Sequence, residues 1–301
     1  MTQRAYLIDA SIYIFRAWFS LPDRWHTRDG WPLNAVYGYC SFLLDFIEST
    51  GTKGYVGVAF DESLGTCFRN EIMPGYKSSR ELPEAALAFQ LKACRHLTEC
   101  FGMPCFGGPR YEADDYLASL AREFQQQRIA VSIITRDKDL SQILFGPGDQ
   151  WWDFAGDCIL DAVGVEKKFG VAPHQFADYL ALVGDPIDDV PGVPGIGPKT
   201  AVRLLLAFGD ITTLQQQLDS VSTLKIRGAA SIEEKLREHW AQLEQARQVT
   251  ALESHIPEIS GMPVFSLHPH QLDAVLAYLQ ELNIQGPLLR RCAVLQQSVS
   301  G

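Results

Sequence analysis

The chain has 301 residues, 47% of them hydrophobic, and a formal net charge of −10 at pH 7. This length supports a large core and two domains, and the ordinary composition excludes a low-complexity or fibrous protein. No apolar run is long enough to span a bilayer, and Asp9 interrupts the segment where a secretory signal would need an apolar run. Seven cysteines without a C-x-x-C pair predict reduced, mostly buried thiols and a cytoplasmic protein.

The acidic charge argues at first against a nucleic-acid partner. How strongly the net charge argues against a nucleic-acid partner depends on where the acids lie in the fold. If nine of them surround bound cations, the rest of the chain is close to neutral, and local basic patches can attract a polyanion. Composition alone therefore leaves a nucleic-acid partner open.

The first half of the chain alternates buried strands with amphipathic helices. Apolar runs predict three main strands, at 5–10, 54–61 and 130–137. Helices are predicted at 33–49, 83–101 and 111–124, and shorter strands at 150–153 and 158–160. Residues 65–83 are polar, basic and turn-rich, so we expect an ordered loop or a mobile arch there. This order predicts an α/β domain, 1–171, with an open parallel sheet and helices on both faces.

From residue 172 the pattern changes to short helices. Pro173 opens the first of them and Gly184 follows its end, which is a common start and stop pair. The predicted helices lie at 173–183, 199–208, 211–218 and 232–252. They form an all-helical domain, 172–254. A C-terminal extension, 255–301, then carries a helix at 270–282 and a loose tail.

Acidic residues follow each main strand. Asp9, Asp61 and Asp137 stand at the carboxyl ends of the three strands, the edge where open α/β sheets bind ligands. Acids in the first turn of the helix at 111–124 reach the same edge if a right-handed crossover connects that helix. Nine acids are thereby expected to converge: Asp9, Asp61, Glu112, Asp114, Asp115, Asp137, Asp139, Asp185 and Asp188.

Such convergence needs neutralising cations. Two like charges ~4 Å apart cost about 4 kcal/mol at an effective dielectric near 20, so without cations the cluster would protonate or unfold the edge. A ligand set of oxygens with no His or Cys favours Mg²⁺ or Mn²⁺ over Zn²⁺. Two such ions ~3.5–4 Å apart are the arrangement that hydrolyses a phosphodiester in line.

Each acid also has a simpler interpretation. Acids in the first turn of a helix favour the helix dipole without any metal, which applies to Glu112, Asp114 and Asp115. A strand-end aspartate such as Asp9 or Asp61 can cap the next element. These interpretations explain single residues, whereas the gathering of all nine at one edge favours a metal site.

A turn rich in Gly and Pro, from Pro194 to Ala201, joins two predicted helices. Gly195 and Gly197 allow a close backbone approach and positive φ, and the N–H groups that open the second helix can bind a phosphate oxygen. Lys199 adds a positive charge, and such contacts ignore base identity. The alternative is a plain helix–helix turn without a ligand.

These stretches resemble the structure-specific 5′ nucleases, or flap endonucleases, over nearly the whole chain. The likeness is to the 5′-nuclease domain of bacterial DNA polymerase I and to free-standing bacterial 5′-3′ exonucleases. It is carried by separated motifs in the family's order: Leu7-Ile8-Asp9-Ala10, Ala59-Phe60-Asp61, Tyr76 to Arg80, Tyr111 to Asp115, Thr135 to Asp139 and Asp178 to Ala201. The resemblance implies a PIN-like sheet and a helix–two-turn–helix module at 173–208 that grips the duplex backbone.

The resemblance also implies residue roles. Asp9, Asp61, Glu112, Asp114 and Asp115 would surround a first metal ion, and Asp137, Asp139, Asp185 and Asp188 a second. Lys77 and Arg80 match basic residues that position the scissile phosphate; without that match we would interpret them as solvated surface charges. Tyr76 would stack on a terminal base. Gly195, Gly197, Lys199 and Thr200 would contact DNA, and several family members bind K⁺ there through loop carbonyls.

Two positions depart from the family's pattern. Arg136 stands where bacterial members usually have Gly before the Asp-Lys-Asp motif. Asp189 adds a charge directly after Asp188. No ligand position is lost, so we expect these departures to affect metal affinity rather than the presence of a site.

The sequence therefore predicts a divalent-metal-dependent 5′ nuclease, a 5′-3′ exonuclease or flap endonuclease, that acts on DNA near 5′ ends or flap junctions. We expect a cytoplasmic monomer without a membrane segment, which works in trans with a DNA polymerase or with replication and repair proteins. Two alternatives remain: a non-catalytic protein that binds branched DNA, and a ribonuclease of the broader PIN-like fold. The complete ligand set counts against the first, and the duplex-gripping hairpin against the second.

Overall fold

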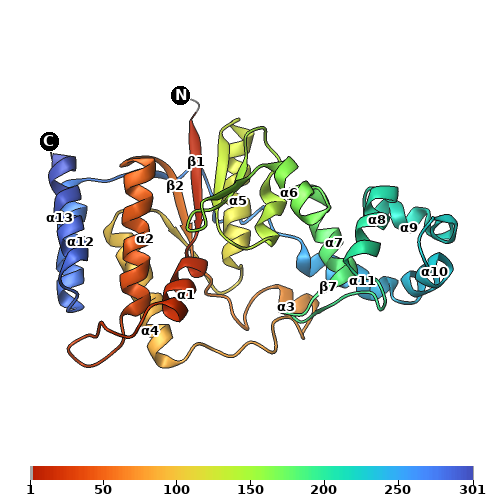
Figure 1. The fold of residues 1–301 in the computed structure, drawn as a ribbon, viewed down its shortest axis with the longest axis horizontal. Coiled ribbons are helices and arrows are strands. Elements are labelled where there is room, and N and C mark those ends of the chain that lie inside the picture. Colours follow the sequence, from red (N-terminus) through yellow and green to blue (C-terminus); the bar gives the residue numbers. More distant parts are fainter. Residues whose placement is uncertain (1–2, 301) are drawn as a thin grey trace.

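The computed structural model describes residues 3–300 and has two parts, a sheet flanked by helices and a smaller helical module (Figure 1). The strands of the sheet are β1 (Arg4–Asp9), β2 (Lys53–Ala59), β3 (Cys105–Phe106), β4 (Ala130–Ile134), β5 (Gln150–Asp153), β6 (Cys158–Leu160) and β9 (Val264–Ser266). Their order is β3-β2-β1-β4-β5-β6, and β9 pairs with the start of β2. The pairs among β1 to β5 are parallel, whereas β6 and β9 run antiparallel to their neighbours.

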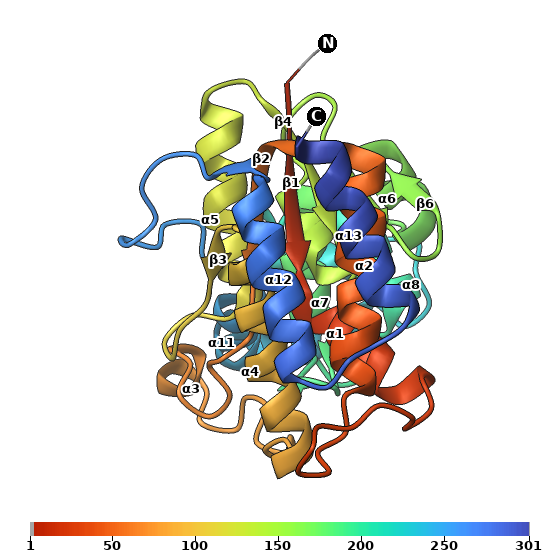
Figure 2. The ribbon, with the colours of Figure 1, turned by 90° about the vertical axis from the view of Figure 1, so that its left-hand side faces the viewer.

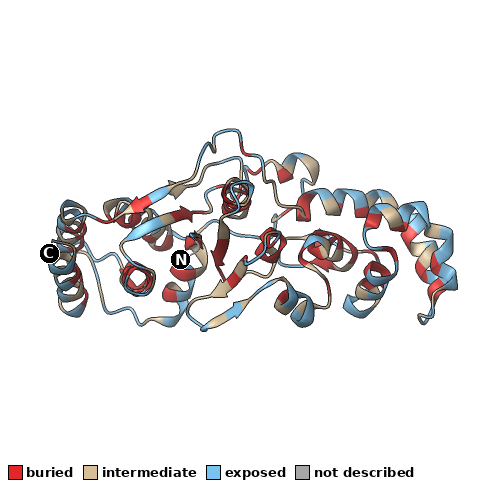
Figure 3. Cartoon of the chain, turned by 90° about the horizontal axis from the view of Figure 1, so that it is seen from above, coloured by how far each residue is buried: buried red, intermediate tan, exposed pale blue. Residues whose placement is uncertain are grey.

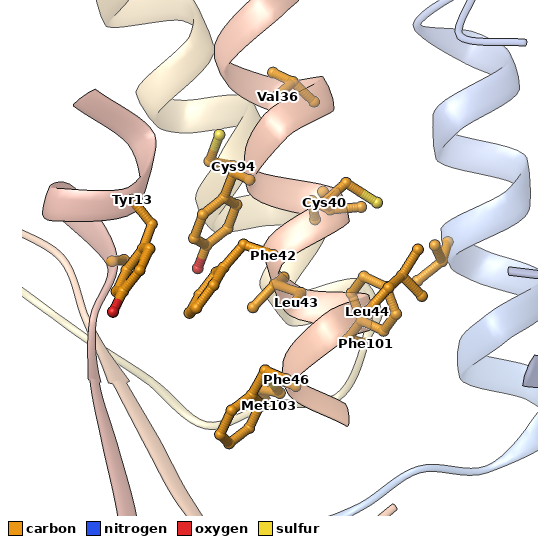
Figure 4. Close-up of a cluster of buried hydrophobic side chains, with 14 of the residues drawn as sticks. Tyr13, Val36, Cys40, Phe42, Leu43, Leu44, Phe46, Cys94, Phe101 and Met103 are labelled. Atoms are coloured by element: carbon orange, nitrogen blue, oxygen red, sulfur yellow. The ribbon is translucent and has the colours of Figure 1, made fainter. Parts of the chain in front are cut away.

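Alternate residues of the central strands point to opposite faces of the sheet and begin two cores. On one face, Ile8 and Val58 pack with the helices α1 (Ala10–Ser20), α2 (Asn34–Thr50), α4 (Ala85–Cys100), α12 (Pro269–Glu281) and α13 (Pro287–Ser300). Figure 4 shows part of this core, in which the rings of Tyr13 and Phe42 are stacked. On the other face, Leu7 and Ile133 pack with α5 (Ala113–Gln126) and α6 (Ala162–Phe169). The prediction of helices on both faces is confirmed.

The helical module encloses a third core. It contains a 3₁₀ turn (Pro173–Gln175), α7 (Phe176–Val183), α8 (Pro198–Phe208), α9 (Ile211–Gln216), α10 (Ala229–Glu238) and α11 (Trp240–Thr250). Its buried residues alternate with exposed ones along the helices, as expected for amphipathic helices around a core (Figure 3). Between α7 and α8, the short strands β7 (Gly184–Asp185) and β8 (Val190–Pro191) pair. Gly184 ends α7 with φ +84°, and a Cβ there would lie 2.5 Å from the backbone nitrogen of Gly192, so the turn requires glycine.

The C-terminal segment returns to the sheet domain. Helices α12 and α13 lie side by side over one face of the sheet, next to α2 (Figure 2). The predicted loose tail is wrong, because Leu288, Cys292 and Leu295 form one buried stripe along α13. The extension therefore completes a core that the first half of the chain begins.

Two further expectations need revision, and a third gains detail. Residues 10–20 form α1, which was not expected; Asp9 both ends β1 and caps this helix. The segment 65–83 agrees with the first of its two expected forms, a loop, and contains a short helix, α3 (Arg69–Ile72). The helix predicted at 232–252 is two helices, since the backbone at His239 leaves helical geometry with φ −103° and ψ 16°.

None of the helices between residues 3 and 300 has the length and apolar character that a bilayer crossing requires. All seven cysteines are free thiols, and four of them, Cys40, Cys67, Cys94 and Cys292, are buried.

Candidate active site at the carboxyl edge of the sheet

Eight of the nine predicted acids line one pocket of about 200 Å³. They are Asp9, Asp61, Glu112, Asp114, Asp137, Asp139, Asp185 and Asp188. Strand β1 pairs in parallel with β2 on one side and with β4 on the other, so the carboxyl ends of the three strands meet. The loop between α7 and α8 brings the last two acids to the same edge. The topology thus gathers acids that lie far apart in the sequence.

Asp9 shows how one residue serves both the fold and the pocket. Its Oδ1 accepts the N–H of Ile12 at 3.5 Å and caps α1, while its Oδ2 accepts the hydroxyl of Thr135 at 2.9 Å. The side chain is buried and still lines the pocket. For Asp9, capping of α1 is therefore compatible with a place in the pocket.

Helix α5 presents Glu112 and Asp114 to the pocket from its first turn. Lys77 Nζ lies 2.5 Å from Oε1 of Glu112, and the Tyr76 hydroxyl donates to Oε2 at 2.9 Å. Burial acts to raise the pKa of Glu112, but the charges of Lys77 and Arg69 outweigh it and hold this pKa below its ordinary value. Glu112 is thus ionised and neutralised by neighbouring basic side chains.

Other acids in the pocket lack such compensation. Burial and the nearby Asp137 carboxylate raise the pKa of Asp9 to about 7. The same two causes raise the pKa of Asp139 to about 7 and that of Asp114 well above its ordinary value. Lys138 Nζ, 3.0 Å from Oδ1 of Asp139, offsets only part of this charge. An oxygen-only donor set with surplus negative charge fits hard divalent cations.

Three basic side chains supply part of the missing positive charge. Arg80 donates to Asp188 at 2.5 Å, and Lys77 also lies 3.8 Å from that carboxylate. Lys138 bridges the pair formed by Asp139 and Asp185, since its Nζ lies 3.1 Å from Asp185. The sequence analysis did not single out Lys138, although its place between two predicted ligands, Asp137 and Asp139, was a usable signal.

The ninth predicted ligand, Asp115, lies outside the pocket. Its side chain is fully buried behind α5, where Arg69 donates to each carboxylate oxygen at 2.6 Å. The N–H groups of Glu112 and Glu253 donate to the same two oxygens. With its acceptor positions filled in this way, Asp115 caps the helix and pairs with Arg69, so its prediction as a metal ligand needs correction.

Tyr76 also differs from expectation. Only 4% of its surface is exposed, and its hydroxyl is held by Glu112 and, at 3.3 Å, by Asp188. A buried ring cannot stack on a base in this arrangement. Phe15 on α1, which the sequence analysis missed, lines the pocket and is 37% exposed, with Phe19 stacked beside it. Phe15 is therefore the more exposed of the two aromatic side chains that line the pocket.

The loop with Lys77 is fastened to the loop between β7 and β8. The N–H of Lys77 donates to the Asp188 carbonyl at 3.0 Å, and that of Ser79 donates to Asp189 at 2.8 Å. Lys77 and Asp189 both have positive φ, +53° and +55°. The unusual Asp189 thus fastens this loop, and Arg136, the other departure, pairs at the surface with Asp153 at 3.2 Å.

The predicted phosphate hairpin joins β8 to α8. Gly195 uses the positive φ that glycine allows, +81°, whereas Gly197 has φ −94° and serves as the residue before α8. A Cβ on Gly197 would meet nothing within 4 Å, so the backbone there is open to close approach. Pro198 has no N–H, and the N–H of Thr200 donates to the Gly197 carbonyl at 3.0 Å, which leaves the N–H of Lys199 as the one in the first turn without a backbone partner within residues 3–300. Lys199 is exposed and Thr200 half-buried on this first turn. Lys235 also reaches the hairpin, 2.5 Å from where a Cβ of Gly195 would be.

Comparison with known families identifies both parts of the chain. Residues 4–170 match the family model of the 5′-3′ exonuclease N-terminal resolvase-like domain, and residues 171–273 match that of the 5′-3′ exonuclease C-terminal SAM fold. The chain belongs to the 5′-3′ exonuclease family. The predicted combination of a PIN-like sheet with a helical module is confirmed.

Relatives of two lengths resemble the chain. It is 32% identical over 294 residues to DNA polymerase I of Rhizobium leguminosarum, covering 96% of this chain and 28% of the relative. It is 36% identical over 209 residues to the 5′-3′ exonuclease of Aquifex aeolicus, covering 69% of this chain and 71% of the relative. The chain thus spans less than a third of the DNA polymerase I relatives and most of the exonuclease.

Solved structures share the fold. The bacteriophage T5 D15 flap endonuclease, in a pseudo-enzyme-product complex with DNA and metal ions, matches with a TM-score of 0.66 and 20% identity, over 99% of this chain and 100% of its own. The catalytic core of Rad2 with a DNA substrate matches with a TM-score of 0.63 and 15% identity, over 100% of this chain and 93% of its own. At these identities the likeness establishes the architecture alone.

The surplus charge of the pocket generates a prediction about Asp139→Asn. The folded-state pKa of Asp139, about 7, lies above its ordinary value of 3.8. Between these values the folded chain binds more protons than the unfolded chain, so the free energy of unfolding falls as pH rises. In EDTA at about pH 8 the variant should therefore melt several degrees above wild type, and the gap should shrink at about pH 5.

Thermal unfolding monitored by circular dichroism, with the exposed Asp29→Asn as control, measures this difference. Added Mg²⁺ should raise the melting temperature of wild type more than that of Asp139→Asn. A variant that is less stable than wild type in EDTA at pH 8 would show that Asp139 is already compensated within the chain.

Proposed function

We propose that the chain hydrolyses DNA phosphodiesters near 5′ ends and 5′-flap junctions by a two-metal mechanism. The observation that carries the proposal is the convergence of eight carboxylates, from three strand ends, helix α5 and the loop after α7, on one pocket. The structures of the T5 flap endonuclease and of Rad2 with DNA support the choice of DNA as substrate. The position of the phosphate-binding hairpin in the loop that also carries Asp185 and Asp188 supports a duplex substrate.

The carboxylates divide into two groups. Asp9, Asp61, Glu112 and Asp114 would hold one divalent ion, and Asp137, Asp139, Asp185 and Asp188 the other. Bound Mg²⁺ or Mn²⁺ would activate the attacking water and neutralise the leaving oxygen. Structures of the T5 exonuclease with metal ions support a divalent cofactor, and the oxygen-only ligands favour these two ions.

Lys77 and Arg80 would act on the substrate phosphate. In this structure they neutralise Glu112 and Asp188. When those carboxylates serve as metal ligands, both basic side chains are free to turn toward the scissile phosphate and hold it. The side chain of Arg80 is already 37% exposed at the edge of the pocket, whereas that of Lys77 is 12% exposed. Arg80 would therefore make the first contact.

The surroundings of the pocket would orient the DNA. Phe15 would stack on a base at the 5′ end, in the role that the sequence analysis gave to Tyr76. The hairpin residues Gly195, Gly197, Lys199 and Thr200 would bind phosphates of the duplex without reading bases, with K⁺ held by the hairpin carbonyls. We further propose a cytoplasmic monomer that acts in trans with a DNA polymerase or repair proteins.

Cleavage of a labelled 5′-flap substrate tests the proposal. Wild type should cut the flap with Mg²⁺ or Mn²⁺ and stop in EDTA. Asp185→Asn should bind the flap but cut it at least about 100-fold more slowly, because one ligand oxygen loses its charge. Asp29→Asn should cut like wild type, since Asp29 is exposed and does not line the pocket.

Two results would contradict this account. Binding of the flap without cleavage under any divalent ion would remove the hydrolytic proposal for this substrate. Faster cleavage of single-stranded RNA than of the flap would favour a ribonuclease of the PIN-like fold.

The hairpin generates a separate prediction. The double variant Gly197→Val, Lys199→Ala should fold, since residue 197 has ordinary φ and free space for a side chain. It should weaken binding of unrelated duplexes to the same extent and lower the slope of log affinity against log salt by about 1, because one phosphate contact is lost. Fluorescence anisotropy in Ca²⁺ measures both quantities.

Lys53→Ala, at the start of β2 on the opposite edge of the sheet, is the matched control. A double variant that binds duplex like this control would exclude the hairpin from DNA binding.

A further inference from the structure

Arg69 is the largest fully buried side chain between residues 3 and 300, with only 1% of its surface exposed. It belongs to α3, in the loop that also carries Lys77 and Arg80. Both terminal nitrogens of its guanidinium donate to Asp115, each at 2.6 Å. A buried guanidinium is costly unless its other N–H groups also find acceptors, so the remaining partners are informative.

Those partners lie at the end of α11. Nε of Arg69 donates to the Val249 carbonyl at 2.8 Å, and Nη2 donates to the Ala251 carbonyl at 2.9 Å. They belong to the last turn of a helix, where carbonyls lack helical partners and a cation is favoured. Helix α11 is part of the helical module, whereas Asp115 is part of α5 in the sheet domain. One guanidinium therefore joins the two parts of the molecule.

Asp115 extends the junction on its own side. Its Oδ1 also accepts the N–H of Glu253 at 2.9 Å, and its Oδ2 accepts the N–H of Glu112 at 3.0 Å. Glu112 starts the turn that presents two carboxylates to the pocket, and Glu253 follows the last helix of the module. The ion pair thus fixes the pocket side of α5 and the end of the module at once.

The module in turn carries the duplex-gripping hairpin. Helix α11 packs against α7 and β8, the elements that flank the loop with Asp185 and Asp188 and lead to Gly195. A shift of α11 relative to α5 would therefore move the hairpin relative to the carboxylates on α5. The loop with Asp185 and Asp188 and the hydrogen bond from Gln142 to the Thr250 carbonyl also restrain this offset. The Arg69 junction joins α5 and the end of α11 directly.

We propose that Arg69 is a positioning residue that fixes the offset between the duplex-binding hairpin and the metal-binding carboxylates, and so selects which phosphodiester is cut. This inference rests on the proposed function. It differs from a purely structural role, in which Arg69 would contribute stability and leave the position of the cut unchanged.

The variant Arg69→Lys tests it. A lysine keeps the charge near Asp115, but one ammonium cannot span a carboxylate and two carbonyls as the planar guanidinium does. The matched control is Arg247→Lys, because Arg247 pairs with the buried Asp178 within the helical module alone. Both variants should lower the melting temperature, and the comparison isolates the junction between the domains.

Cleavage products of a 3′-labelled flap substrate are resolved to single nucleotides under single-turnover conditions. For Arg69→Lys we expect the dominant product of wild type to lose at least about half of its share to products one or two nucleotides away. The Kd for the flap in Ca²⁺ should stay within about threefold, because the DNA contacts are intact. Arg247→Lys should keep the wild-type product pattern.

Hydrogen exchange gives a second readout that does not need cleavage. The N–H of Glu253, which donates to Asp115, should exchange at least about tenfold faster in Arg69→Lys than in Arg247→Lys. Should Arg69→Lys fail to fold, Asp115→Asn weakens the same ion pair. Its product pattern and its exchange at Glu253 are then compared with those of Arg247→Lys.

An unchanged product pattern in Arg69→Lys, or unchanged exchange at Glu253, overturns the positioning role. If wild type itself cuts no flap, the proposed function fails, and exchange at Glu253 alone decides whether Arg69 couples the domains.

Discussion

Repulsion among carboxylates is the constraint on which the rest of this structure depends. Eight of them line one pocket, and a pair of like charges ~4 Å apart costs about 4 kcal/mol at an effective dielectric near 20. Lys77, Arg80 and Lys138 form ion pairs in the pocket, but they neutralise only some of the acids. Burial, together with the negative charge that remains, raises the pKa of Asp9 and Asp139 to about 7. We infer that a fold that tolerates this charge is organised for cations, with the basic loop and hairpin beside them to bind a polyanion.

The strands and the convergence of their acids could be predicted from the sequence, because short apolar runs ending in Asp carry both signals at once. Parallel pairing then brings those ends together regardless of their separation in the chain. What the sequence could not decide was the direction of neighbouring side chains. Asp114 and Asp115 are adjacent acids on one helix, yet a step of about 100° turns one to the pocket and the other to Arg69, 46 residues earlier.

Other elements escaped prediction for similar reasons. Tyr76 lies in the expected motif, but the motif does not reveal that its side chain is buried. Its hydroxyl is held by Glu112 and Asp188, which only the tertiary fold brings to it. The buried stripe of α13 has meaning only against α2 and α12, which the tertiary fold brings beside it. Asp, Gly and Pro mark the loop from Gly184 to Thr200 in the sequence. The structure adds that this loop is one link between the hairpin and the pocket, and that Arg69 forms another.

The central claim, that the pocket binds two divalent cations, is tested most directly by diffraction from crystals grown with Mn²⁺, with data collected at the manganese absorption edge. The account predicts two anomalous peaks ~3.5–4 Å apart inside the pocket. One should lie beside Glu112 and Asp114, and the other beside Asp139 and Asp185, with Lys138 displaced from between that pair. A pocket without peaks, or with Lys138 still bridging Asp139 and Asp185 at saturating Mn²⁺, would contradict it.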